Sequence, residues 1–86
     1  MDLGHLEKER AKFDQALKTA DLLNEKIVAV HIRIQRAERA KTQNPMGIRH
    51  LKLKVETYEK IQMIYLIYAI RKSVDMANYI QSYRHG

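Results

Sequence analysis

Histidine is the residue type in this 86-residue chain best suited to hold a metal ion, but the histidines are not spaced to form a site. No two of them are three or four residues apart, the spacing that brings two side chains together on one helix face. Zinc sites need three or four converging ligands. We therefore expect no metal and no other cofactor. The histidines are His5, His31, His50 and His85.

The groups that could perform acid–base or nucleophilic catalysis are also scattered. The closest carboxyl pairs are Glu7 with Glu9 and Glu56 with Glu59. Both lie in lysine-rich polar stretches, where nothing indicates a desolvated pocket that would shift a pKa. The chain contains no cysteine, and its three glycines lie too far apart to form a phosphate-binding loop. We therefore expect that this protein is not an enzyme.

Basic residues form the most distinctive group, because the whole net charge of +6 falls within positions 33–54. This stretch holds seven basic residues against one acidic residue, Glu38, whereas the rest of the chain holds nine of each. Such a cluster is typical of a surface that binds nucleic-acid phosphates, acidic lipids or an acidic protein. It is equally typical of a solvated end that keeps an assembly in solution. The seven residues are Arg33, Arg36, Arg39, Lys41, Arg49, Lys52 and Lys54.

Hydrophobic spacing predicts a long helix over positions 2–41. Apolar residues recur there every three or four positions, as in the seam of a coiled coil, and Glu9 occupies the one vacant place in the series. Asp2 is suited to cap the first turn. The apolar seam consists of Leu6, Phe13, Ala16, Ala20, Leu23, Ile27, Val30, Ile34 and Ala37.

We expect a turn over positions 42–47 and a second helix over 48–84. Within the turn, Asn44 is suited to an N-cap and Pro45 to the first helical position after it. The two long helices would then form an antiparallel, all-α helical hairpin. This hairpin is a single domain over 1–86, with the basic cluster at its tip.

A competing arrangement, αββα, arises because two segments alternate apolar and polar residues. Positions 28–34 and 51–55 both show this period of two, and they would flank the turn as a central β-hairpin. In that arrangement Arg33, Lys52 and Lys54 share one face of a ribbon, a form that can enter a nucleic-acid groove. We favour helices because both segments also fit a spacing of three and four residues.

The second helix carries more apolar surface than one neighbouring helix can cover. One stripe contains Val55, Tyr58, Tyr65, Ala69, Met76, Tyr79 and Tyr83, and a second contains Met63, Ile67, Ile70, Val74 and Ala77. Because a helix that is apolar on two sides is surrounded by partners, we predict self-association. A closed dimer that forms a four-helix bundle is the most economical assembly. The residues predicted to mediate it are Tyr58, Ile61, Met63, Ile64, Tyr65, Ile67, Tyr68, Ile70, Val74, Met76 and Tyr79.

The C-terminal half also follows the pattern of a known family. The dipeptide Asn44-Pro45 precedes a segment of about 40 residues, which contains Leu51, Tyr58 and Ile61 and closes with Ile80-Gln81-Ser82-Tyr83-Arg84. In these features the chain resembles the needle subunits of bacterial type III secretion systems, which are small, cysteine-free helical hairpins. The resemblance implies a secreted subunit that polymerises into a hollow filament lined by its C-terminal helix.

The sequence opens without a basic or apolar leader, and its longest uninterrupted apolar run, positions 63–70, is shorter than the roughly 20 residues that span a membrane. We therefore expect no cleaved signal peptide, no membrane span and a cytoplasmic location, with signal-less secretion as the alternative. The expected function is that of a non-enzymatic, self-associating assembly or adaptor protein whose basic tip contacts an acidic partner. Two alternatives stay open: a small nucleic-acid-binding protein, and the secretion filament that the resemblance implies.

Overall fold

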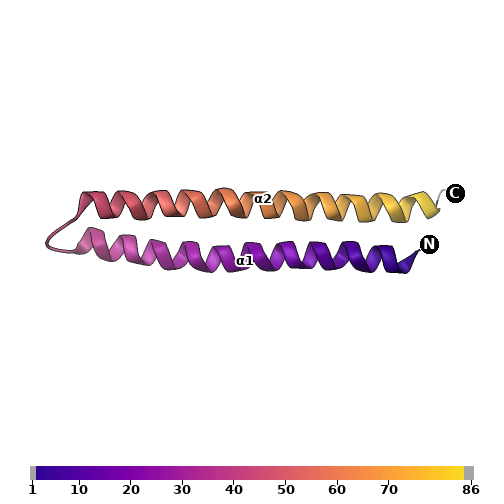
Figure 1. Cartoon of the computed structure of the whole chain (residues 1–86), viewed down its shortest axis with the longest axis horizontal. Helices are drawn as coiled ribbons and strands as arrows, with labels where there is room; N and C mark the ends of the chain where they lie inside the picture. Colours follow the sequence, from indigo (N-terminus) through magenta and orange to yellow (C-terminus); the bar gives the residue numbers. More distant parts are fainter. Residues whose placement is uncertain (1, 85–86) are drawn as a thin grey trace.

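The computed structural model describes residues 2–84, which form two antiparallel helices joined by a short connection (Figure 1). Helix α1 spans Leu3–Arg39 and helix α2 spans Pro45–Arg84. The hairpin measures 68 × 14 × 13 Å between Cα atoms, and the two ends of the chain lie together, opposite the connection. The prediction of an all-α helical hairpin is therefore confirmed.

The face of α1 that packs on α2 is the predicted seam. Six of its positions are buried, among them Glu9, and the remaining four are half-buried. The densest packing lies in the half of the hairpin nearer the connection, where Ile27, Val30 and Ile34 of α1 enclose Val55 of α2. Towards the chain ends the buried apolar residues are the small side chains Ala16, Ala20 and Ala69.

The expectation that α1 extends to residue 41 is wrong, because the helix ends at Arg39. The backbone of Ala40 is already extended, with φ −67° and ψ 143°. The side-chain amide of Gln43 donates a 2.7 Å hydrogen bond to the carbonyl of Glu38, which satisfies one of the last carbonyls of the helix. The chain therefore leaves the helical conformation two residues before the predicted end.

The N-terminal cap of α2 is the one predicted, but the turn is shorter than the expected range 42–47. Helix α2 begins at Pro45 rather than at residue 48, because Asn44 caps the first turn. The Asn44 Oδ1 accepts from the backbone N–H of Gly47 at 3.2 Å, and its carbonyl accepts from Ile48 at 3.0 Å. Proline lacks an N–H and is tolerated at the first helical position.

The alternative αββα arrangement is wrong, since the part of the chain that the structure describes contains no strand. Both segments with alternating apolar residues are helical. In α1, Val30 faces the core while Val28 and Ile32 lie half-exposed on the outside of the helix. In α2, Val55 is buried and Leu53 is half-exposed. The alternation therefore reflects additional apolar residues on the outer faces of two helices.

Candidate interaction surfaces

An ion pair lies inside the contact between the two helices. The Lys72 Nζ is 2.9 Å from the Glu9 Oε2, and the Lys12 Nζ is 3.4 Å from the Glu9 Oε1. The hydrogen bond from Lys72 lowers the pKa of Glu9, against the opposing effect of burial, and Lys12 lowers it further. The same bond to Glu9 raises the pKa of Lys72. Glu9 thus occupies the vacant place in the α1 seam as half of an ion pair with α2.

A second polar side chain lies in the same contact. The Gln62 side-chain amide donates a 3.1 Å hydrogen bond to the carbonyl of Ala20. Along the line of α2 that faces α1, Gln62, Ala69 and Lys72 therefore occupy places that large apolar side chains could have taken. The aliphatic side chains of Ile64, Ile67 and Ile70, in the same part of α2, are exposed.

The second apolar stripe of α2 is exposed along its whole length. We call Met63, Ile67, Ile70, Val74 and Ala77 the outer stripe. The exposed fractions of its four larger members lie between 45% and 63%, and Ala77 is exposed as well. Beside it runs a shallow groove, whose walls are mainly apolar. Its lining residues are Phe13 and Leu17 of α1 and Leu66, Ala69, Ile70, Ser73 and Val74 of α2.

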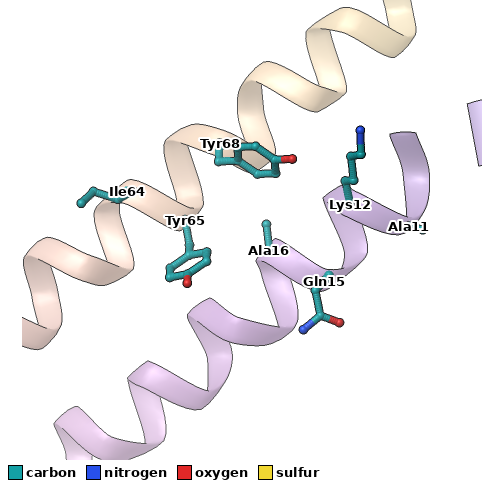
Figure 2. A pocket seen from close by; sticks show the side chains of 7 residues that line it. All are labelled: Ala11, Lys12, Gln15, Ala16, Ile64, Tyr65 and Tyr68. Carbon is teal, nitrogen blue, oxygen red and sulfur yellow. The ribbon is translucent and has the colours of Figure 1, made fainter. Parts of the chain in front are cut away.

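A second groove, of about 590 Å³, is lined by tyrosines (Figure 2). Tyr65 and Tyr68 project from α2 towards α1, where Ala16 faces them, whereas Ile64 points away. The rest of the lining comes from Ala11, Lys12 and Gln15 of α1. The Lys72 Nζ lies 5.5 Å from the centre of the Tyr68 ring, a cation–π distance. The walls of this groove, like those of the groove beside the outer stripe, are mainly apolar.

Three of the residues predicted to mediate self-association are half-buried within the hairpin. Tyr58 packs on the cluster formed around Val55, and Met76 is half-buried. The Tyr79 hydroxyl accepts a 3.0 Å hydrogen bond from the backbone N–H of Asp2, and the Tyr79 ring centre is 4.6 Å from that of His5. These residues hold the hairpin together, whereas the other predicted residues are exposed.

The basic cluster lies at the hairpin tip, as the sequence indicated. Its members occupy the last turns of α1, the connection and the first turns of α2. Of these seven basic residues, only Lys52 has an acidic partner within residues 2–84, Glu38 at 3.9 Å, and both side chains are exposed. The first turn of α2 contains no acidic residue. The positive dipole end of α2 and the negative dipole end of α1 both lie at the tip and oppose each other, so the positive charge comes from the side chains. The tip is therefore a strongly positive surface made by the end of α1, the connection and the start of α2.

The side chains that could bind a metal ion do not converge among the described residues. Within residues 2–84, no three histidine or carboxylate side chains gather in a way that could hold a metal ion. Neither of the two described helices is long and apolar enough to cross a membrane. Comparison of the chain with protein-family models, curated proteins and solved structures finds no match. The surfaces described above are therefore the basis on which function can be argued.

Proposed function

We propose that this chain is a non-enzymatic assembly protein that associates with itself through the outer stripe and presents its basic tip to an acidic partner. The observation that supports the proposal is the exposure of Met63, Ile67, Ile70 and Val74 on one side of α2. Burial of an aliphatic side chain is worth roughly 1.5–3 kcal/mol, of which about half is unrealised while the side chain is half-exposed. A partner helix that covers these side chains would supply the remaining burial free energy.

The total surface of the chain supports the same proposal. A compact protein of 10.2 kDa has roughly 5,300 Å² of accessible surface, whereas this hairpin has 6978 Å². A stable interface buries about 800 Å² on each partner. The excess is therefore large enough for one or two such interfaces. One isologous interface between two hairpins gives a closed four-helix bundle.

Light scattering across protein concentration, at low and at high salt, tests this proposal. We expect a constant dimer mass at both salts, because the outer stripe carries no charge. Ile70→Asp, which places a charge in the interface, should reduce the mass to that of a monomer or unfold the chain. Leu53→Asp is the matched control, because Leu53 lies on the same helix with 52% exposure but outside the stripe.

Other masses would contradict the closed dimer. Growth without limit as concentration rises would favour the filament that the needle-subunit resemblance implies. A folded monomer at all concentrations would mean that the outer stripe does not mediate self-association. An Ile70→Asp variant that keeps the wild-type dimer mass would exclude the stripe as the interface.

The basic tip supports a second candidate function, nucleic-acid binding. Six of its seven basic residues lack an acidic partner within the described residues, and cationic side chains bind phosphates with an affinity that falls steeply with salt. No recognition motif accompanies them, so the contacts would be made to the backbone. Fluorescence anisotropy with labelled duplex and single-stranded DNA tests this function. If neither duplex nor single-stranded DNA binds at low salt, nucleic-acid binding is excluded as a function.

A further inference from the structure

We propose that the second copy docks on the outer stripe in the antiparallel orientation, centred on Ile70, so that the two basic tips lie at opposite ends of the dimer. This inference rests on the proposed self-association and adds its geometry. Three features support it: the distribution of charge along the hairpin, the position of the stripe on α2, and the residues that each orientation places opposite one another.

Charge disfavours the parallel orientation. The net charge of +6 lies entirely within positions 33–54, and the tip holds it at one end of a 68 Å rod. A parallel dimer would bring two such tips side by side, at packing distances of about 10 Å between helices. It would also place Lys52 against its own copy and Glu56 against its own copy. Like charges that face each other across an interface oppose association.

The antiparallel orientation instead matches unlike side chains. The outer stripe runs from Met63 to Ala77, and Ile70 lies at its midpoint. If a twofold axis passes at Ile70, each residue faces the one equally distant on the other side of Ile70. Met63 then lies opposite Ala77, a large side chain against a small one, as interdigitated packing requires. Glu56 lies opposite Arg84, a pair of opposite charge.

This geometry leaves both tips uncovered. From Ile70 to Pro45 the helix rises about 37 Å, whereas from Ile70 to Arg84 it rises about 21 Å. Each tip therefore extends roughly 16 Å beyond the end of the partner hairpin, and the two tips lie about 75 Å apart. A dimer of this form presents two positive surfaces, directed away from each other, to an anionic partner.

Disulfide cross-linking tests the orientation cleanly, because the chain contains no cysteine. The variants Met63→Cys, Ile70→Cys and Ala77→Cys each introduce a single thiol at an exposed position of the stripe. A disulfide requires Cα atoms within about 7 Å. In the antiparallel dimer, two copies of residue 63 lie about 21 Å apart, as do two copies of residue 77. Leu53→Cys serves as the exposed control outside the stripe.

We expect Ile70→Cys to form a cross-linked dimer on oxidation, and Met63→Cys or Ala77→Cys alone to form none. A mixture of Met63→Cys and Ala77→Cys should give the mixed disulfide, identified by mass spectrometry of the linked peptides. Cross-linking of Met63→Cys and Ala77→Cys each with itself would show a parallel dimer, which overturns this inference but keeps self-association. A dimer mass without any stripe cross-link would overturn the docking surface, and a monomer mass would overturn both proposals.

Discussion

The Lys72 Nζ and the Glu9 Oε2 lie 2.9 Å apart, and this ion pair joins α2 to α1 inside the contact between the helices. The exposed fractions of the two side chains are only 19% and 11%. Removing one partner of a covered ion pair is destabilising, because it leaves the other charge without compensation. A shift of one helix along the other would do the same. The pair therefore holds the register of the hairpin.

The ion pair predicts how stability depends on pH. Because the pKa of Glu9 is lowered in the folded chain, its contribution is complete above the ordinary glutamate pKa of roughly 4.3 and is lost as pH falls through the folded value. Glu9→Gln should lower Tm at neutral pH and weaken its decline on acidification. Thermal denaturation by circular dichroism between neutral and acidic pH measures both effects.

The control for this experiment is Glu25→Gln, because Glu25 is exposed and forms no ion pair among the described residues. Its acid decline should match that of the wild type. Lys72 affects stability at alkaline pH and not at acidic pH. Because its pKa is raised in the folded chain, its contribution to stability is lost only as pH rises through the folded pKa. An unchanged acid decline in Glu9→Gln would mean that the pair does not contribute to stability.

The packing near the tip predicts a large cost for Ile27→Ala. Ile27 belongs to the buried cluster, and truncation of a buried isoleucine costs roughly 2–5 kcal/mol in the free energy of unfolding. Ile32→Ala is the matched control, because Ile32 lies on the same helix with 44% exposure; it should change stability by about 0.5 kcal/mol or less. Urea denaturation at fixed protein concentration gives both values. Equal costs would show that the buried face of α1 is assigned wrongly.

The cap of α2 predicts a moderate cost for Asn44→Ala. This change removes the side-chain oxygen that accepts from the backbone N–H of Gly47, and loss of an N-cap costs roughly 1 kcal/mol. Thr42→Ala, an exposed change in the same connection, should have little effect. Thermal denaturation of the two variants under identical conditions makes the comparison. If the two variants melt alike, the cap contributes nothing measurable.

The unpaired charge at the tip predicts a change in salt dependence. If Arg36 and Arg39 contact phosphates, replacing both with glutamine should lower the slope of log K against log salt for duplex DNA by about two. A variant with Lys8 and Lys18 replaced by glutamine has the same net charge but an intact tip, and its slope should change less. Anisotropy titrations at several salt concentrations give the slopes. Equal slopes in the two variants would show that the tip is not the binding surface.

The sequence by itself determined the helices, the seam of α1 and the place of the basic cluster. These features depend on local rules, because the periodicity of apolar residues and the capping chemistry of Asn44-Pro45 involve neighbours in the chain. The helix ends were predicted less well. Helix α1 ends at Arg39, where the side chain of Gln43 bonds the carbonyl of Glu38, a contact that periodicity does not reveal.

Only the tertiary structure decided which side of α2 faces α1, and hence which residues remain available to a partner. The two apolar stripes of α2 are comparable in the sequence, and the outer one contains no polar residue. The line that packs on α1 includes Gln62 and Lys72 because each has a partner there, the carbonyl of Ala20 and the carboxylate of Glu9. Each of these contacts joins residues that are far apart in the sequence, and it forms only when the two helices are aligned in this register. The spacing of residues within either helix therefore cannot predict it.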